Sequence, residues 1–202
     1  MLEMRTKQAH LKHMDTKVEF LEGQFLVAMP GMGDPRFEHT VIYLCAHSAE
    51  GAMGLIINKP APDVRFNDLL EQLNITGEGE LGEQQVYFGG PVEHGRGFVL
   101  HSDEYFVPNS TLRIDGGASM TATVDILKDI AGGRGPTMSL MTLGYAGWGP
   151  GQLESELQAN GWLSCDANDD IIFHMRPEKK WEAALHQIGI DPRLLSAEGG
   201  RA

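Results

Sequence analysis

The chain has 202 residues, of which 42% are hydrophobic and 22% are charged, and its formal net charge is −12. This length and this hydrophobic fraction are typical of one globular domain with a substantial core. A strongly negative chain without a run of Lys or Arg repels phosphate backbones, which disfavours direct binding to nucleic acid. No apolar segment is long enough to span a bilayer, and residues 1–19 lack the apolar stretch of a signal peptide.

The sequence shows no internal repeat and no linker between domains. We therefore expect a poorly ordered N-terminal tail at residues 1–19, a single α+β domain at 20–195 and a C-terminal tail at 196–202. No pattern in the chain indicates an oligomeric state.

The first elements of the domain alternate apolar runs with turn residues. The run at 25–29 predicts a buried strand, and Asp34 followed by proline predicts one helical turn at 35–38. Residues 40–47 are rich in β-branched and aromatic side chains and predict a second strand. Residues 52–58 predict the strand that returns from it in a hairpin.

The next elements begin after a cluster of prolines, which ends the hairpin because proline cannot donate to a central ladder. Leucines spaced by three and four residues predict a helix over 65–74. Two short strands follow at 86–88 and 97–101, and we expect them to pair as antiparallel neighbours. Residues 112–114 predict a short edge strand.

The third part of the chain holds the predicted central strand, at 137–145. Before it, Thr123 predicts the cap of a helix that ends at the glycine pair 132–133. After it, another helix begins near Pro150, and we expect Gly161 to take the left-handed conformation beyond its last turn.

The C-terminal part predicts a hairpin of strands at 162–165 and 171–175, then a last helix. That helix carries Trp181, Leu185 and Ile188 on one face, which we expect to be buried. Strands and helices alternate irregularly and hairpins are frequent. The pattern therefore favours an α+β fold with a mixed sheet over a regular parallel α/β fold.

The segment 143–154 joins the central strand to the following helix and contains four glycines and a proline. Its composition indicates a backbone that bends tightly around its own core or around a ligand. Tyr145 and Trp148 fit both interpretations. They can stack on a planar ligand or partner, or they can be core aromatics that hold the loop in place.

Cys45 and His47 are the sharpest candidates for catalysis. Strand alternation places them on one face, where the imidazole can lower the pKa of the thiol and create a nucleophile. The alternative, which we favour, is a small apolar cysteine packed inertly in a strand. The other cysteine is Cys165, and neither belongs to a CxxC motif. Two such thiols favour a reduced, cytoplasmic protein, with a disulfide between them as the alternative.

Standard signatures of nucleotide, metal and hydrolase sites are missing from the sequence. It contains no phosphate-loop motif, no HExxH and no GxSxG. The eight histidines show no ligand spacing, so we expect no metal site and no cofactor.

Glycines and cations collect at predicted strand ends, where clefts commonly form. Lys59 and Arg96 can hold a carboxylate or phosphate, or they can pair with a neighbouring Asp or Glu. The candidate ligand-binding residues are Asn58, Lys59, Gly89, Gly90, Arg96, Tyr145 and Trp148.

Several motifs occur in a fixed order along the chain. They are Met29-Pro30, Asp34-Pro35-x-Phe37, Gly51-Ala52-Met53-Gly54-Leu55-Ile56-Ile57-Asn58-Lys59-Pro60, Gly89-Gly90-Pro91-Val92, Arg96-Gly97-Phe98-Val99-Leu100-His101, Leu143-Gly144-Tyr145-Ala146-Gly147-Trp148, Gly151-Gln152-Leu153-Glu154 and Trp162-Leu163. Together they strongly resemble the bacterial YqgE/AlgH family, over roughly residues 23–190.

The resemblance implies an α+β fold whose mixed, mostly antiparallel sheet is bent and forked, closes into a pseudo-barrel and is covered by helices. It implies a cytoplasmic bacterial protein. It brings no established activity and no catalytic residues, because the family is associated only with a proposed role in transcriptional regulation of alginate synthesis. Ala46 stands where relatives often carry an acidic residue, which weakens a Cys–His–carboxylate site here.

The leading hypothesis is a non-enzymatic binding or regulatory module. It binds a small anionic ligand or a protein partner in a cleft near Lys59, Gly90, Arg96, Tyr145 and Trp148. One alternative is a thiol-dependent enzyme that uses the candidate cysteine at position 45. The other alternative is a regulator that binds DNA directly, which the acidic charge disfavours.

Overall fold

The computed structural model describes residues 20–77 and 84–195. The tails expected at 1–19 and 196–202 lie outside the described residues. No helix within the described ranges has the length and the apolar character needed to cross a membrane.

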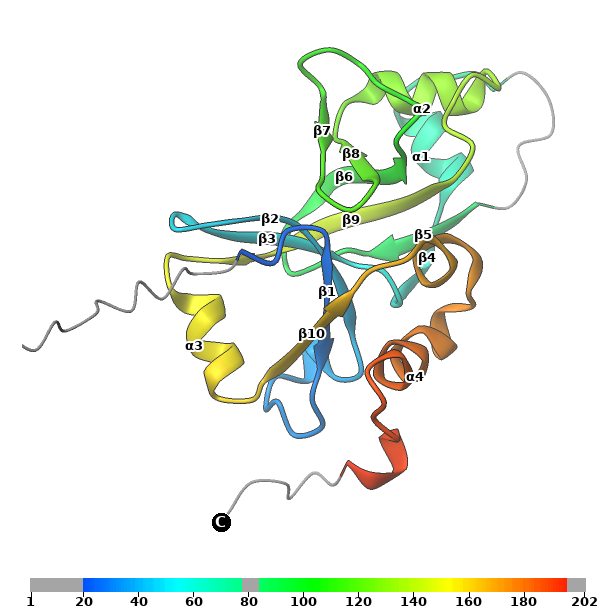
Figure 1. Cartoon of the computed structure of the whole chain (residues 1–202). Helices are drawn as coiled ribbons and strands as arrows, with labels where there is room; N and C mark the ends of the chain where they lie inside the picture. The colour runs from blue at the N-terminus through cyan, green and yellow to red at the C-terminus, as the bar shows by residue number, and fades with distance from the viewer. Residues whose placement is uncertain (1–19, 78–83, 196–202) are drawn as a thin grey trace, which may run out of the picture.

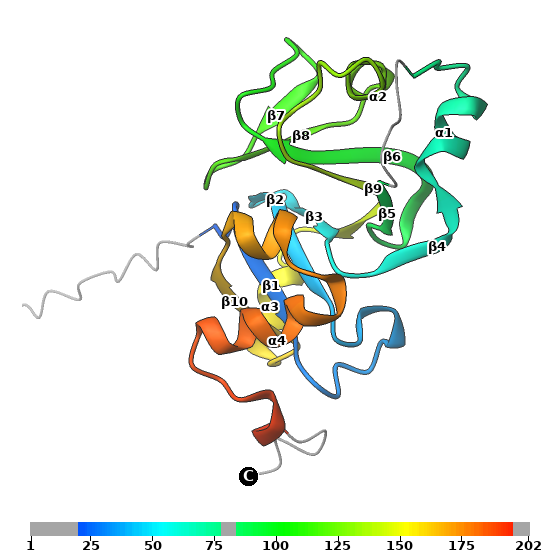
Figure 2. The same ribbon diagram turned by 90° about the vertical axis from the view of Figure 1, so that its right-hand side faces the viewer.

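Ten strands form one curled sheet, and helices cover it (Figures 1 and 2). The strands are β1 (Gln24–Ala28), β2 (Val41–Ser48), β3 (Gly51–Ile56), β4 (Pro60–Arg65), β5 (Gln85–Phe88), β6 (Val92–Ser102), β7 (Thr111–Arg113), β8 (Ala118–Thr121), β9 (Ser139–Trp148) and β10 (Trp162–Asp166). The helices are η1 (Pro35–Phe37), α1 (Phe66–Gln72), α2 (Val124–Ala131), α3 (Gln152–Gln158), η2 (Asp170–His174), α4 (Pro177–Gln187) and η3 (Pro192–Leu194).

The sheet runs in the order β10-β1-β2-β3-β9-β6-β8-β7, and β5 and β4 branch from β9. Every pair is antiparallel except β5 with β9. The expected α+β fold with a bent, mostly antiparallel sheet is therefore confirmed. Strand β9 is the branch point, because Leu143 pairs with Phe88 on one edge and with Gly97 on the other.

Three apolar clusters hold the sheet and the helices together. The largest lies under η2 and α4 and includes Tyr43, Cys45 and Trp181. A second cluster lies under α3, and a third packs α1 and α2 against β5, β6 and β9. In Figure 1, α1 and α2 stand at one end of the molecule, while α3 and α4 flank β1 and β10 at the other. Burial of these apolar surfaces is the main stabilising contribution.

Most elements predicted from apolar periodicity are present. The hairpin of β2 and β3, the central strand, the edge strand β7 and the four longer helices all form near their expected positions. Asp34 caps η1 as expected, because its carboxylate accepts from the backbone N–H of Arg36 at 3.0 Å. Thr123 is the N-cap residue of α2 but makes no side-chain capping bond.

The expected pairing of 86–88 with 97–101 is wrong. Strand β5 instead runs parallel to β9, and β6 lies on the opposite edge of β9. The two strands are separated because the chain crosses β9 at Gly89 and Gly90. The residues of a short apolar strand do not indicate which neighbouring strand it pairs with. Local sequence therefore could not exclude this arrangement.

The strand expected at 171–175 is also wrong, because residues 170–174 form a short π-helix, η2. Its partner in the predicted hairpin, β10, pairs with β1 instead. The side chain of Asn168 accepts from the N–H of Ile171 at 3.0 Å, and Lys180 donates to the carbonyl of Ile172 at 2.7 Å. A short apolar run fits a buried strand and a buried helix equally well, and these tertiary bonds select the helix.

Two helix ends differ from expectation. Ile188 is exposed, because α4 ends at Gln187 before its apolar face reaches that position. At the end of α3 the left-handed residue is Asn160, with φ of 56°, and not Gly161. The N–H of Gly161 donates to the carbonyl of Glu156 and that of Asn160 to Leu157, which is a Schellman motif one residue earlier than expected.

Strands β4 and β8 were not predicted. The two prolines of β4 argue against a central strand, but they are tolerated because β4 pairs only with β5 and lies at the edge of its branch. Strand β8 is a fully buried four-residue run between a glycine turn and α2, too short to give a periodic signal.

Candidate functional site

The glycine pair Gly89 and Gly90 lies where the sheet forks. The N–H of Gly89 donates to the carbonyl of Leu143, and its carbonyl accepts from Ile56, so one residue joins β9 to β3. A Cβ atom on Gly90 would overlap the backbone of Tyr145. These glycines therefore have a structural role, which is the close crossing of two backbones.

Tyr145 and Trp148 lie on opposite faces of β9. Tyr145 packs against the large cluster under α4, whereas Trp148 belongs to the cluster under α3. Both residues nevertheless line one open depression together with Arg96, and Trp148 also lines a second hollow beside α3. The segment 144–148 is not a loop, because it continues the central strand.

The first hollow, which we call the Tyr145 groove, is an open depression of about 640 Å³. Its floor contains Met53, Phe98, Met120 and Tyr145, and the rings of Phe98 and Tyr145 meet edge to face at 5.7 Å. At the rim, the guanidinium of Arg96 lies 5.1 Å from the ring centre of Phe98. It also pairs with the exposed carboxylate of Glu93 at 3.2 Å.

The second hollow, which we call the Glu156 pocket, has a volume of about 560 Å³ and lies between α3 and η1. Oε2 of Glu156 accepts hydrogen bonds from Nε1 of Trp148 and from Nε1 of Trp162, each at 2.8 Å. The two indoles meet edge to face at 5.9 Å, and Phe37 meets Trp162 in the same way at 5.6 Å. Sequence analysis missed Glu156 because nothing local shows that two distant indoles converge on it.

Asn58 and Lys59 lie in neither hollow. The amide of Asn58 accepts from the N–H of Val41 and donates to the carbonyl of His39, each at 2.8 Å, which fastens the end of β3 to β2. Lys59 donates to the carbonyl of Arg36 at 2.8 Å, and partial burial lowers its pKa. Both residues line a separate depression of about 360 Å³ beside α4.

Cys45 and His47 do not face one another, and the expectation that they share a face is wrong. The pairing of β2 with β3 shifts between Leu44 and Ala46, so the strand contains a β-bulge. A bulge adds one residue and reverses the alternation beyond it. Cys45 consequently points into the cluster under α4, whereas the imidazole of His47 reaches α3.

The thiol of Cys45 is fully buried, with an exposed fraction of 0%, and donates to the carbonyl of Tyr43 at 3.6 Å. Burial raises its pKa, so the protonated and unreactive form is favoured. Cys165 is also buried and free, and burial raises its pKa to about 11. These environments are typical of structural cysteines.

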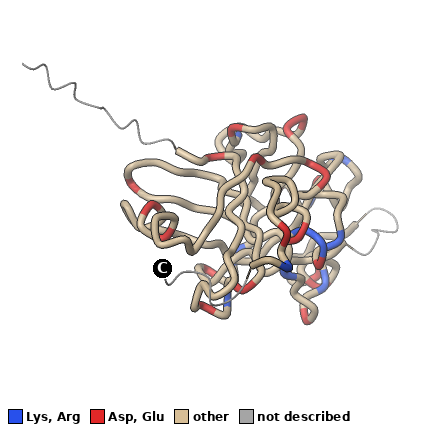
Figure 3. Tube along the Cα trace, turned by 60° about the horizontal axis from the view of Figure 1, so that its bottom comes forward, with Lys and Arg blue, Asp and Glu red and all other residues tan. Residues whose placement is uncertain are grey.

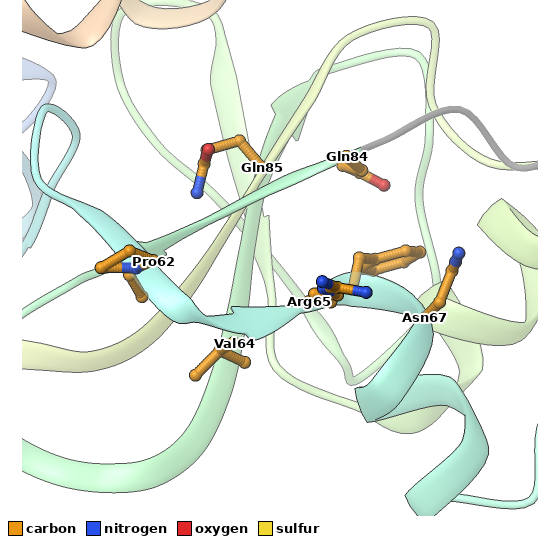
Figure 4. A pocket seen from close by; sticks show the side chains of 8 residues that line it. Pro62, Val64, Arg65, Asn67, Gln84 and Gln85 are labelled. Atoms are coloured by element: carbon orange, nitrogen blue, oxygen red, sulfur yellow. The ribbon is translucent and has the colours of Figure 1, made fainter.

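A further hollow of about 530 Å³ opens between β4 and β5 and was not expected (Figure 4). The two strands pair only at Pro60 with Tyr87 and at Arg65 with Gln85, and the intervening residues of β4 separate from β5. The side chains of Gln85 and Arg65 are drawn on opposite sides of this gap in Figure 4. The prolines of β4, which open the hydrogen-bonded ladder with β5, were the sequence feature from which this hollow could have been predicted.

Most of the described Lys and Arg side chains pair with a carboxylate nearby in the sequence, whereas acidic residues outnumber basic ones in the chain. Basic segments lie close to acidic ones along the trace in Figure 3, and Arg36 with Asp34 and Arg193 with Asp191 form short ion pairs of 2.7 and 2.6 Å. Residues 20–77 and 84–195 contain no group of three or more His, Cys, Asp or Glu side chains placed to hold a metal ion.

Comparison with known families gives one match over most of the chain. The family described as DUF179: AlgH-like matches residues 25–193. A UPF0301 protein of Bradyrhizobium diazoefficiens is 56% identical over 190 residues, which cover 91% of this chain and 89% of that protein. A UPF0301 protein of Rhodopseudomonas palustris is 54% identical, covering 91% of this chain and 88% of that protein.

Two solved structures have a similar fold. The solution structure of the AlgH protein from Pseudomonas aeruginosa superposes with a TM-score of 0.75 at 41% identity, covering 98% of this chain and all of that one. Protein DIP2367 from Corynebacterium diphtheriae superposes with a TM-score of 0.69 at 21% identity, covering 88% of this chain and 92% of that one, and supports the fold alone.

Proposed function

The chain belongs to the AlgH-like family, and we propose that it is a non-enzymatic binding module with a regulatory role, whose Tyr145 groove binds a protein partner. The observation that carries this proposal is an open, apolar floor of methionines and aromatic rings next to an exposed guanidinium. An apolar segment of the partner fills the floor, and an acidic or other small anionic group of the partner meets Arg96.

The chemistry of the floor supports this kind of occupant. Met53 and Met120 have flexible, polarisable side chains that adapt to irregular apolar partners. Phe98 and Tyr145 supply large, rigid contact areas of the type that dominate binding energy at interfaces. Because the groove is open to solvent, it suits part of a macromolecule better than a small molecule that must be enclosed.

The charged rim supports selectivity for an acidic contact. The side chain of Arg96 is 55% exposed, and its Nη1 pairs with the exposed carboxylate of Glu93 at 3.2 Å. Exchanging a solvent-exposed ion pair for a carboxylate of the partner costs little, because exposed pairs contribute about 0–1 kcal/mol. A carboxylate that is excluded from water by the neighbouring apolar contact binds a guanidinium more strongly.

The state of the cysteines supports the non-enzymatic part of the proposal and its cytoplasmic setting. A thiol nucleophile must be accessible and largely deprotonated, whereas Cys45 is buried and its pKa is raised. Cys45 and Cys165 are both free. Two reduced thiols are in keeping with a reducing compartment, so the proposal includes a cytoplasmic site of action.

Photo-crosslinking tests the position of the interface. A benzophenone amino acid replaces Ser48 at the rim of the Tyr145 groove, and in a control chain it replaces Lys128 on α2. We expect a specific crosslinked protein with the first chain and its absence with the second. The crosslinked protein is then purified and titrated against the unmodified chain.

Two matched charge reversals test the contact itself. Arg96→Glu reverses the guanidinium at the groove, and Arg113→Glu reverses an exposed arginine that also lies over an aromatic ring, 4.7 Å from the ring centre of Phe106. We expect Arg96→Glu to weaken binding about tenfold or more and Arg113→Glu to change it less than about twofold. Equal effects of the two reversals would contradict the proposed site.

A further inference from the structure

Glu156 is held in place by neutral donors. Its Oε2 accepts from two indoles, and its Oε1 accepts from Nε2 of Gln152 at 2.9 Å. None of the described Lys, Arg or His side chains lies within ion-pair distance of it. The protein therefore fixes the orientation of a carboxylate at the wall of a hollow without pairing its charge inside the described structure.

The free acceptor capacity of this carboxylate is at Oε1. A carboxylate oxygen accepts about two hydrogen bonds, so the two indoles saturate Oε2. Gln152 occupies one of the two positions on Oε1 and leaves one for another donor. Because Glu156 lines the pocket of about 560 Å³, that position is available to a molecule that enters the pocket.

The surroundings of Glu156 favour a positively charged occupant. The other two charged residues of the pocket are Arg36 and Asp34, which form three side-chain hydrogen bonds of 2.7 to 3.1 Å with each other and so largely cancel. The pocket therefore carries about one net negative charge. Its aromatic lining comes from Phe37, Trp148 and Trp162, whose rings attract cations through their π systems.

We propose that the Glu156 pocket binds an alkylguanidinium group, such as the side chain of an arginine in a peptide. One guanidinium N–H donates to Oε1 of Glu156, and the flat cation and its alkyl stem pack on the aromatic lining. Guanidinium is favoured over ammonium because it is planar, is weakly hydrated and stacks on aromatic rings. This pocket shares Gly147 and Trp148 with the Tyr145 groove, but Phe37, Glu156 and Trp162 line this pocket and not the groove.

The three tryptophans provide a direct measurement. Trp148 and Trp162 donate their indole N–H groups to Glu156, whereas Trp181 donates to the carbonyl of Ala28 at 2.9 Å on the far side of the sheet. In a ¹H–¹⁵N NMR titration of the full chain with N-acetylarginine amide, we expect the indole signals of Trp148 and Trp162 to shift and saturate. The signal of Trp181 should stay in place.

Matched ligands and variants make the result decisive. N-acetylcitrulline amide has the shape of the arginine probe without its charge, and we expect it to bind at least about tenfold more weakly. Glu156→Gln removes the charge but keeps an oxygen that accepts from both indoles. We therefore expect it to weaken binding of the arginine probe by a similar factor. Glu182→Gln on α4 removes the same charge at a distance and should change the affinity less than about twofold.

Three outcomes would overturn the proposal. The first is saturating arginine titration without movement of the Trp148 and Trp162 signals. The second is equal affinity for the arginine and citrulline probes, or equal effects of the two glutamine variants. The third is tighter binding of N-acetyllysine amide than of the arginine probe, which would exclude a site selective for guanidinium. The unshifted Trp181 signal shows in each case that the variants remain folded.

Discussion

The imidazole Nε2 of His47 lies 3.1 Å from Oε1 of Glu154, so the end of β2 is tied to the first turn of α3. The other ring nitrogen, Nδ1, accepts from the backbone N–H of Leu21 at 3.0 Å. Because Nδ1 is an acceptor, Nε2 carries the proton and donates it to the carboxylate. His47 thus joins three segments of the chain, and its exposed fraction is only 6%.

This arrangement predicts a graded effect of substitutions at Glu154. Glu154→Ala leaves a buried N–H of His47 without an acceptor and should lower the free energy of unfolding by about 1–2 kcal/mol. Glu154→Gln keeps an acceptor oxygen and should cost less. Urea denaturation measures both. If Glu154→Ala is equally costly in a His47→Ala background, the hydrogen bond is not the source of the effect.

Two glycines with the same positive φ predict different effects of alanine. Gly144 and Gly151 both have φ of 72°, but a Cβ atom at Gly144 would lie 2.5 Å from the carbonyl oxygen of Gly90, whereas nothing lies within 4 Å at Gly151. Gly151→Ala should cost about 1–2 kcal/mol for the left-handed conformation alone. Gly144→Ala should cost at least about 2 kcal/mol more, because the forked sheet must open.

Chemical denaturation of both variants measures this difference, and the expected order follows from the crowding at Gly144. A similar loss of stability in Gly144→Ala and Gly151→Ala would mean that the crossing at Gly90 yields easily. The tight fork would then be a weak constraint on the fold.

Lys180 predicts a rise of stability at alkaline pH. Its exposed fraction is 1%, its Nζ donates to the carbonyls of Ile57 and Ile172, and no carboxylate of the described residues pairs with it. Burial lowers its pKa from 10.5 to about 8. Between these values the unfolded chain binds the proton and the folded chain does not, so stability from this group rises with pH.

The measurement is the free energy of unfolding of the native chain minus that of Lys180→Met, from pH 7 to pH 10.5. Taking the difference cancels the titration of groups that both chains share. We expect it to increase by about 3 kcal/mol at most, with most of the rise above pH 8. A difference that stays constant or falls over this range would contradict a buried, easily deprotonated lysine.

Both cysteines should resist alkylation in the folded chain. Cys45 and Cys165 are buried and free, and burial raises both pKa values, so neither presents an accessible thiolate. With iodoacetamide followed by mass spectrometry, we expect no labelling under native conditions and two labels after denaturation. Labelling of Cys45 at the rate of a free thiol would instead favour the thiol-dependent enzyme.

Local sequence was sufficient for much of the fold. The hairpin of β2 and β3, the capped turn after Asp34 and the amphipathic helices follow from side-chain periodicity and from cap residues. These features depend on interactions within a few residues. The bent, helix-covered sheet was expected from the order of the motifs, which resembles that of a known family. That expectation rests on similarity to relatives and not on the periodicity or chemistry of the side chains.

The candidate site required the tertiary structure. The residues Asn58, Gly89 and Gly90 were correctly located at strand ends, but their hydrogen bonds and crowding give them structural roles there. Arg96, Tyr145 and Trp148 do line one groove. Phe98 follows Arg96 by two residues on β6, but nothing near them in sequence shows that Met53 and Met120 complete the floor, because these residues come from β3 and β8.

The segment between Leu143 and Glu154 shows the division most clearly. Local sequence is sufficient to predict that its glycines bend or crowd the backbone and that a strand leads into a helix there. That Tyr145 and Trp148 face opposite ways follows from tertiary contacts, because pairing with β3 and β6 extends the strand through both residues. Strand alternation then separates side chains by parity, and pairing over long distances in the chain sets where the strand ends.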